Sequence, residues 1–204
     1  LVGGTGLYFK ALTDGLVNIP NIPTKFRNKI RTLNKKLGSK NFYSKLLKLD
    51  PLVKNRIKIH DTQRAIRAYE VKLYTKKSMY EWFRNTRSEF EKDDFYKIYL
   101  DLPRDRIINR INARTLDMVN RGAILEVEKF LRLRISSSKT AYKAIGIKEI
   151  KDFLNKKIEI SEVIERISIK SRQYAKRQVT WARGNMIDWN KVSSDALNKF
   201  LKKI

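Results

Sequence analysis

The 204-residue sequence predicts an α/β fold whose incomplete sheet is interrupted by a helical insertion. Leu1 and Val2 fit the end of a buried strand, and the glycine-rich segment 3–6 fits a tight turn that leads into a helix. Apolar side chains alternate over residues 96–102, which indicates a second strand. Most of the chain between these segments has helical spacing. Because two or three strands do not bury both faces of an α/β sheet, we expect the sheet to be incomplete.

Two prolines mark the expected domain boundary. Pro20 and Pro23 break regular structure after the first helix. The chain from there to residue 95 is polar and helical in spacing, and strand character returns at residue 96. We therefore expect a core formed by residues 1–19 and 96–204, into which residues 20–95 are inserted as a helical domain.

Capping residues predict where the helices of the insertion begin and end. Thr24 is a candidate N-cap for the first helix, and Gly38 is a candidate stop at its C-terminus. Residues 41–50 fit a second, short helix. A third helix is expected to begin with Asp61 or Thr62 as its cap.

The C-terminal half is also predicted to be mostly helical. A helix after the strand is expected to end at Gly122, and a long helix is expected to cover residues 161–183. Residues 185–189 fit a short strand. Ser193 or Ser194 is a candidate N-cap for a terminal helix.

The composition indicates a polyanionic partner. The sequence has 46 Lys and Arg against 21 Asp and Glu, a net charge of +25, and nucleic acid is the commonest partner of such a surface. The coding bias of an A+T-rich genome is the alternative, but it does not readily explain a two-fold excess of cations. The lack of cysteine excludes disulfides, thiolate metal sites and Cys nucleophiles, and the single His60 disfavours a His-rich metal site or a Ser-His-Asp triad. No window approaches 18 uncharged apolar residues, so no membrane segment is expected.

The helix expected over residues 161–183 has two different faces. On a helical wheel Arg172, Lys176 and Arg183 fall within ~80° of one another, and apolar residues such as Val163 fill the opposite arc. The segment RQYAKRQVTWARG contains no acidic residue to pair with its cations. A solvated helix face is the plain interpretation, and a phosphate or nucleic-acid contact is the functional one.

Three polar side chains stand at the start of another expected helix. Gln63, Arg64 and Arg67 lie in its first turns, and the two arginines point the same way because they are three residues apart. Such side chains can contact base edges or phosphates, and the helix start adds backbone N–H groups. Ordinary surface polarity beside a cap is the alternative interpretation.

Two glycine-containing segments give weaker signals. Lys143 and Lys148 flank Gly146, which is expected early in a helix, where it permits close approach of another backbone or simple helix packing. The turn at residues 3–6 is neither G-x-x-x-x-G-K-[ST] nor G-x-G-x-x-G, so it is not a phosphate-binding loop of either kind. Taken alone, it fits an ordinary turn between a strand and a helix.

Several stretches together resemble the tRNA dimethylallyltransferase (tRNA isopentenyltransferase) family. They cover nearly the whole chain in the family's order and spacing: LVGGTGLYFKAL, DTQRAIRAYEV, the run of Met118, Gly122, Glu126 and Val127, KAIGIKE, and SRQYAKRQVTWARGN. The resemblance implies a P-loop-kinase-like parallel sheet core and a mostly α-helical insertion that clamps the tRNA anticodon stem-loop. It also implies transfer of a dimethylallyl group from dimethylallyl diphosphate to the exocyclic amine of the adenosine next to the anticodon, which gives isopentenyladenosine.

The same resemblance implies a set of residues that contact tRNA. Thr5 is expected in the channel at the substrate base, where it positions the substrate. The expected tRNA-binding residues are Thr5, Arg27, Gln63, Arg64, Ala65, Ile66, Arg67, Lys143, Ala144, Ile145, Gly146, Ile147, Lys148, Lys176, Arg177, Gln178, Val179, Thr180, Trp181, Ala182 and Arg183. Mg²⁺ is the expected cofactor, although no metal ligand is assigned within this chain.

The resemblance also predicts which catalytic parts of the family are not among these 204 residues. In the family, a P-loop and an Asp that is the proposed base on the adenosine amine precede the segment matched by Leu1. We therefore expect a C-terminal portion that is inactive without an N-terminal part, which could be encoded separately. A non-catalytic tRNA-binding fragment and a degraded gene product are the alternatives. A cytoplasmic monomer that does not contact membranes is expected.

Overall fold

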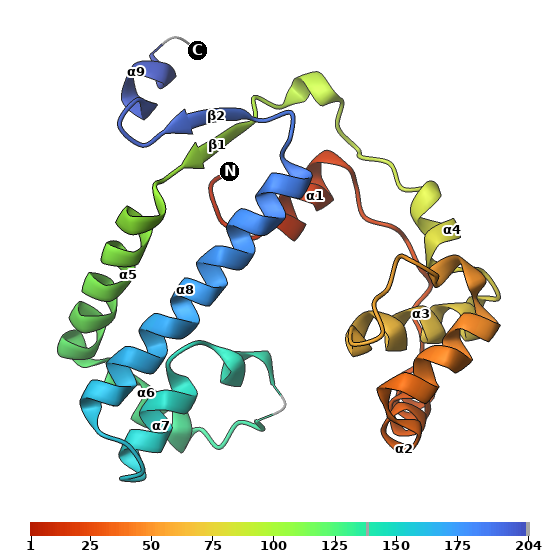
Figure 1. Ribbon diagram of the computed structural model, residues 1–204, viewed down its shortest axis with the longest axis horizontal. Helices are drawn as coiled ribbons and strands as arrows, with labels where there is room; N and C mark the ends of the chain where they lie inside the picture. Colours follow the sequence, from red (N-terminus) through yellow and green to blue (C-terminus); the bar gives the residue numbers. More distant parts are fainter. Residues whose placement is uncertain (138, 203–204) are drawn as a thin grey trace. The chain divides into compact units, whose positions relative to one another are not determined.

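The computed structural model describes residues 1–137 and 139–202, which form mainly helices and a small parallel sheet (Figure 1). The contacts divide the chain into two units, one of Leu1–Gly6 with Tyr96–Ile204 and one of Leu7–Phe95. In the first unit β1 (Ile98–Asp101) pairs in parallel with β2 (Asn190–Ser193), with Ile98 opposite Asn190. The predicted α/β class with a parallel sheet is therefore confirmed.

The division between the units falls at Gly6, whereas we expected it at residue 19. The reason is the packing of the chain that follows α1 (Gly6–Thr13). The backbone oxygen of Leu12 accepts a hydrogen bond of 2.8 Å from Ser88 Oγ. Gly15 has a φ of +88°, and a Cβ there would overlap the backbone of Arg87. These contacts tie residues 12–15 to the end of the second unit.

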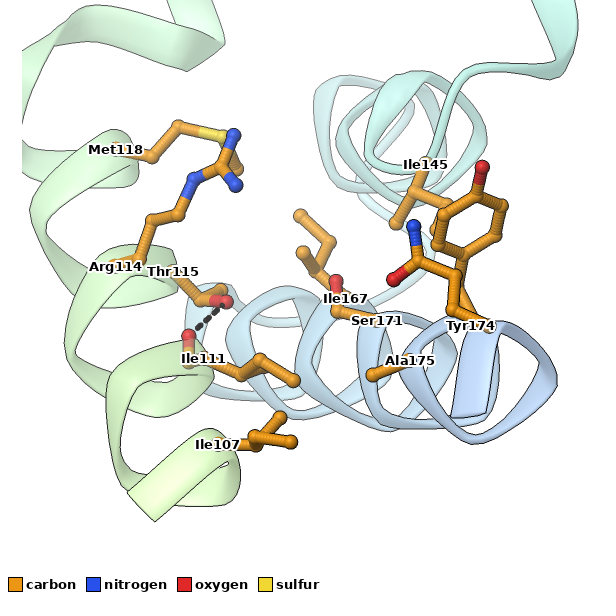
Figure 2. A pocket seen from close by; sticks show the side chains of 11 residues that line it. Ile107, Ile111, Arg114, Thr115, Met118, Ile145, Ile167, Ser171, Tyr174 and Ala175 are labelled. Carbon is orange, nitrogen blue, oxygen red and sulfur yellow. Dashed lines mark hydrogen bonds between the residues drawn. The ribbon is translucent and has the colours of Figure 1, made fainter. Parts of the chain in front are cut away.

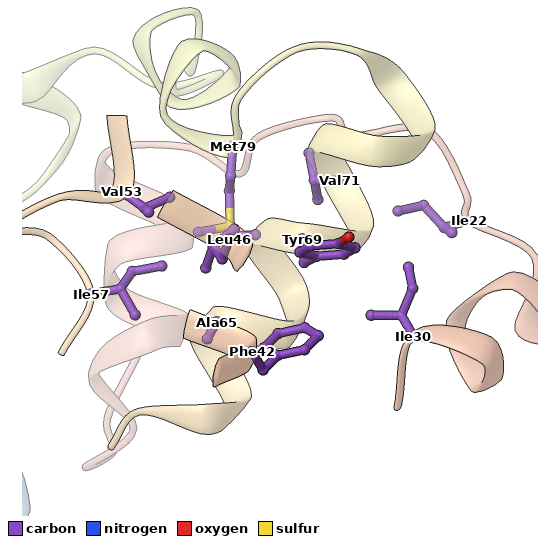
Figure 3. Close-up of a cluster of buried hydrophobic side chains, with 11 residues drawn as sticks. Ile22, Ile30, Phe42, Leu46, Val53, Ile57, Ala65, Tyr69, Val71 and Met79 are labelled. Carbon is purple, nitrogen blue, oxygen red and sulfur yellow. The ribbon is translucent and has the colours of Figure 1, made fainter. Parts of the chain in front are cut away.

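The Leu7–Phe95 unit is a helical domain with one apolar core. After α1 its elements are α2 (Thr24–Leu49), η1 (Pro51–Val53), α3 (Thr62–Thr75), α4 (Met79–Arg84) and η2 (Lys92–Asp94). Figure 3 shows Phe42 and Leu46 of α2 facing Tyr69 and Val71 of α3. Phe42 and Leu46 are fully buried, and the rings of Phe42 and Tyr69 lie 5.0 Å apart. Each such side chain contributes roughly 1.5–3 kcal/mol on burial, so this core can hold α2 against α3.

One helix boundary in this unit differs from the prediction. Thr24 is the first residue of α2 rather than its N-cap, because Pro23 precedes the helix without a capping side chain. Gly38 has a φ of +73° and a ψ of 164°, which are not helical, so α2 consists of two helices that meet at a kink and reach Leu49. The predicted stop at Gly38 is therefore confirmed, and the short helix expected at residues 41–50 is the second of the two. Asp61 is confirmed as the cap of α3, and its Oδ1 accepts a hydrogen bond of 3.2 Å from the Arg64 N–H.

The other unit combines the sheet with helices packed along α8. Its helical elements are α5 (Arg104–Met118), η3 (Val119–Ala123), α6 (Ile124–Arg132), η4 (Thr140–Lys143), α7 (Ile147–Leu154), α8 (Ile160–Asn185) and α9 (Leu197–Leu201). Gly122, with a φ of +102°, separates α5 from α6, as its predicted role as a helix stop requires. A second apolar cluster of Val127, Ile150, Val163 and Ile167 joins α6, α7 and α8.

Three predictions about this unit are wrong. Leu1 and Val2 form no strand with the described residues, and both are almost fully exposed. A strand needs a neighbouring strand for its backbone hydrogen bonds, and no described segment pairs with these two residues. The strand expected at residues 185–189 lies at β2 instead. The start of the expected segment completes α8, and the N–H of Asn190 donates a hydrogen bond of 3.0 Å to Lys97 O at the start of the sheet.

The third correction concerns the last helix. Ser193 ends β2 and Ser194 lies in the turn after it, so neither caps α9. Ala196 precedes that helix, and no side chain caps it. Within residues 1–137 and 139–202, no helix is long and apolar enough to cross a membrane.

Candidate nucleic-acid interface

The glycine-rich start of the chain packs closely on α8. A Cβ on Gly4 would overlap the Gln178 side chain, and a Cβ on Gly6 would overlap the Trp181 ring. Gln178 Nε2 also donates a hydrogen bond of 3.0 Å to Gly4 O. The two glycines therefore let the backbone reach α8, and Thr5 between them is exposed beside that helix. Sequence reasoning missed this contact, although the spacing of Gln178 and Trp181 by three residues places them on one helix face.

The structure confirms that α8 has one buried face and one cationic face. Val163 and Ile167 are buried, whereas Lys176, Arg177 and Arg183 are exposed. These three cations form no salt bridge with an acid of residues 1–137 or 139–202. The guanidinium of Arg177 stands 5.5 Å from the ring centre of Tyr174, which is itself exposed. This half of α8 therefore presents uncompensated positive charge beside the segment that holds Thr5.

The cations in the first half of α8 have partners within the same unit. Arg166 pairs with Glu162 one turn earlier on α8, and Lys170 donates to Glu149 of α7. Arg172 is half-buried, and its Nη1 donates to Asn112 Oδ1 at 3.2 Å. The residues that remain available to an anion are thus concentrated in the C-terminal half of α8, where the predicted run Lys176–Arg183 lies.

The predicted segment Lys143–Lys148 forms a turn at the start of α7. Gly146 precedes that helix with a φ of +107°, and a Cβ there would meet only Ile167 Cδ1, at 3.6 Å. The expectation that Gly146 lies early in a helix and admits another backbone is therefore wrong, since the position needs glycine for its backbone angle. Lys143 ends η4 before this turn, and Lys148 lies in α7, which begins at Ile147; both lysines are exposed.

Glu149 fastens this turn to α8. Its side chain is 4% exposed and accepts hydrogen bonds from the Gly146 N–H, at 3.0 Å, and from Lys170 Nζ. Burial alone would raise the pKa of Glu149, but the bonds from Lys170 and Gly146 hold its pKa below the ordinary value. The ionised carboxylate therefore links the turn of Lys143–Lys148 to the helix that carries Lys176–Arg183.

A cavity of about 420 Å³ lies between α5 and α8. Figure 2 shows Ile107 and Ile111 of α5 and Ser171 and Ala175 of α8 around it. Gln178, which bonds to Gly4 O, also lines the cavity, so the cavity borders the glycine-rich start. Its walls are mainly apolar.

In the Leu7–Phe95 unit a second group of predicted residues comes together at α3. Arg27 of α2 and Arg67 of α3 both contact the carboxylate of Glu70, at 3.3 and 3.6 Å. Gln63 and Arg64 are exposed in the first turn of α3. Sequence reasoning missed the buried Glu70; its position three residues after Arg67 was the available signal.

Some predicted contact residues are covered by the fold. Ala65 is 3% exposed in the helical core, and Ala182 is 6% exposed in the other unit. Their side chains pack inward, while Ile66 and Val179 are half-buried. The cations, Gln63, Thr5 and Thr180 remain at least partly exposed and can contact an anionic partner.

The described residues contain no group of three or more His, Cys, Asp or Glu side chains that could hold a metal ion. We assign none of the described residues to the metal that the resemblance implies.

The family of the chain follows from comparison with known proteins. A family model described as IPP transferase matches residues 1–185. The chain therefore belongs to the IPP transferase family. Its glycine-rich start and its cationic segments lie within the matched residues.

Relatives and solved structures agree with that family. A "tRNA dimethylallyltransferase" of Pelagibacter ubique is 54% identical over 204 residues, which are 100% of this chain and 65% of the relative. One of Rickettsia massiliae is 38% identical over 189 residues, 92% of this chain and 52% of the relative. The chain thus spans between about half and two thirds of the length of these relatives.

Two solved structures are similar in fold. The full-length tRNA isopentenylpyrophosphate transferase of Bacillus halodurans superposes with a TM-score of 0.53 at 30% identity, over 93% of this chain and 57% of that protein. A eukaryotic dimethylallyltransferase acting on tRNA superposes with a TM-score of 0.74 at 25% identity, over 94% of this chain and 50% of that protein. These matches confirm the predicted P-loop-kinase-like α/β class.

Proposed function

We propose that this chain takes part in tRNA modification as a tRNA dimethylallyltransferase. The reaction transfers a dimethylallyl group from dimethylallyl diphosphate to the exocyclic amine of the adenosine next to the anticodon, and it gives isopentenyladenosine. The proposal rests on membership of the IPP transferase family and on the relatives of that name. Modification of tRNA places the proposed site of action in the cytoplasm.

The observation that carries the proposal is the meeting of the glycine-rich start with α8. Gly4 and Gly6 allow this segment to lie on Gln178 and Trp181, and Thr5 is exposed at the contact. The neighbouring half of α8 carries the cations of Lys176–Arg183, which no acid of the described residues neutralises. A polar residue beside uncompensated cations can position a nucleotide while the cations bind its phosphates.

The remaining predicted contacts extend the proposed interface. In the same unit the turn Lys143–Lys148 is fastened to α8 by Glu149. In the Leu7–Phe95 unit Arg27 and the segment Gln63–Arg67 present cations and a helix start to the anticodon stem-loop. The insertion is thereby proposed to clamp that stem-loop.

In this proposal these residues hold tRNA, and the P-loop-bearing N-terminal part of the family holds the diphosphate. The 204 residues contain no G-x-x-x-x-G-K-[ST] pattern. We therefore expect the chain alone to bind tRNA without forming isopentenyladenosine, and to form it when a P-loop-bearing N-terminal part of the family is supplied.

The test of binding is a double substitution on α8. Arg177→Ala with Arg183→Ala should weaken binding of an unmodified anticodon stem-loop RNA and flatten the salt dependence of log K by about 2, or roughly 1 for each phosphate that is no longer neutralised. Binding is measured by fluorescence anisotropy in a salt series. The matched control replaces Arg121 and Arg132, and it makes the same charge change. Each of these arginines already pairs with an acid four residues earlier in the chain.

Equal losses of affinity in the two double variants would remove α8 from the interface. The activity test incubates the chain with dimethylallyl diphosphate, Mg²⁺ and the same RNA, with and without the P-loop-bearing part. Product from the chain alone would contradict the assignment of the diphosphate chemistry elsewhere. An absence of RNA binding by the unsubstituted chain would overturn the proposed function.

A further inference from the structure

Four charged side chains from two helices meet in the Leu7–Phe95 unit. Arg27 and Arg31 lie on adjacent turns of α2, and Arg67 lies one turn before Glu70 on α3. The Nε atoms of Arg27 and Arg31 stand 3.3 and 4.0 Å from the carboxylate oxygens of Glu70, and Arg67 Nη1 stands 3.6 Å away. One carboxylate thus lies within 4.0 Å of three guanidinium groups, and among the described residues its hydrogen bond comes from Arg27. We call the three arginines the arginine cluster.

The acid is buried, whereas the cations are partly exposed to solvent. The side chain of Glu70 is 2% exposed, whereas those of Arg27, Arg31 and Arg67 are 40%, 51% and 39% exposed. Together with Glu70 the cluster therefore carries a net charge of +2, which lies on its solvent side. Arg27 and Arg31 approach Glu70 with Nε, and no hydrogen bond among the described residues uses their terminal nitrogens.

The physical role of the carboxylate follows from charge repulsion. Three guanidinium groups around one point repel each other, and Arg27 and Arg31 are like charges at i and i+4. Without Glu70 these long side chains would spread into solvent over many rotamers. A carboxylate that fixes them beforehand lowers the entropy cost of binding, and guanidinium forks match the oxygens of a phosphate.

We propose that Glu70 is a positioning residue that holds Arg27, Arg31 and Arg67 together as one binding site for a phosphodiester group of RNA. The proposal rests on the proposed tRNA-binding function, and it adds Glu70 and Arg31 to the contacts considered above. The ligand is the anionic phosphodiester backbone, because the exposed groups are guanidinium nitrogens, which donate hydrogen bonds and accept none.

The sign of the charge effect makes the proposal testable. Glu70→Gln keeps the side-chain shape and removes one negative charge. If Glu70 contributed only charge, the substitution would strengthen RNA binding, as should Glu89→Gln, which makes the same charge change at an exposed position of the same unit. If Glu70 positions the arginine cluster, Glu70→Gln weakens binding of the anticodon stem-loop about tenfold and flattens the salt slope by about 1.

The assay is fluorescence anisotropy of the 204-residue chain with the stem-loop RNA over a salt series, with circular dichroism as the check of folding. Weaker binding by Glu70→Gln but not by Glu89→Gln supports the proposal. Equal or tighter binding by Glu70→Gln overturns it while leaving the proposed function in place. An unsubstituted chain that binds no RNA overturns the proposed function itself.

A second pair of variants decides the question if Glu70→Gln loses its helical signal. Arg31→Ala removes one arginine of the cluster, and Lys29→Ala makes the same charge change about 200° around α2 from Arg27. The proposal expects a loss of binding in Arg31→Ala that is several-fold larger than in Lys29→Ala. Equal effects in the two variants would overturn it.

Discussion

Replacing Gly6 by Ala tests whether the start of the chain lies on α8. A Cβ at Gly6 would overlap three atoms of the Trp181 ring, Cδ2, Cε3 and Cζ3. Carbon atoms pack best at about 3.5–4.0 Å, so the indole must move by about 1 Å or more. Overpacking of this kind costs typically about 1–3 kcal/mol. We therefore expect Gly6→Ala to lower the free energy of unfolding by that amount.

The matched control is another glycine of the same unit. Gly184 lies within α8, and a Cβ there would meet nothing within 4 Å. Gly184→Ala should stabilise the helix by about 0.5–1 kcal/mol, because alanine loses less backbone entropy on folding. Urea unfolding followed by circular dichroism measures both changes.

A double-mutant cycle separates the overlap from any other effect of alanine at Gly6. Trp181→Ala removes the ring, so Gly6→Ala made in that background should cost almost nothing. The coupling between the two positions is then about as large as the cost of Gly6→Ala alone. If Gly6→Ala were as stable as the unsubstituted chain, or cost the same in both backgrounds, the segment would not lie on Trp181.

Two further predictions concern buried acids. Ser78→Ala removes the Oγ bond of 2.7 Å to Asp50 Oδ2 and one capping bond of α4, and it should lower the free energy of unfolding by about 1–3 kcal/mol in urea titrations; an unchanged midpoint would contradict the buried bond. The pKa of Glu149 lies below its ordinary value of 4.5, so its contribution to stability is complete above that pH and is lost as the pH falls through the folded-state pKa. Glu149→Gln should therefore destabilise the chain at pH 7 and have less effect at pH 3, and an equal loss at both pH values would refute this sign.

The features that sequence predicted well depend on neighbours along the chain. Asp61 caps α3 because its carboxylate reaches an N–H three residues away. The two faces of α8 follow from a period that the sequence displays directly. Local signals failed where a distant partner decides: β2 begins at Asn190 because the Lys97 backbone lies there, 93 residues earlier in the chain.

The candidate interface shows the same limit. Charge and spacing alone indicated Gln63, Arg64, Arg67 and the run at Lys176–Arg183, whereas Thr5 and Arg27 came from the family resemblance. Neither route found Glu70, because its contact with Arg27 joins residues 43 positions apart on two helices. Glu70 stands three residues after Arg67, but that spacing alone does not show burial, and the packing of α2 on α3 reveals it.

Two of the buried carboxylates suggest how a chain with this excess of cations keeps its cationic segments in place. Glu149 joins the turn before α7 to α8, and Glu70 joins α2 to α3, so each acid stands where two segments that bear cations meet. A surface acid would neutralise one cation and be screened by salt, whereas a buried acid contacts several donors at once and is screened much less. Removing either acid raises the net charge yet should loosen the arrangement of the cations. The effect on RNA binding therefore depends on where an acid lies more than on how many acids the chain has.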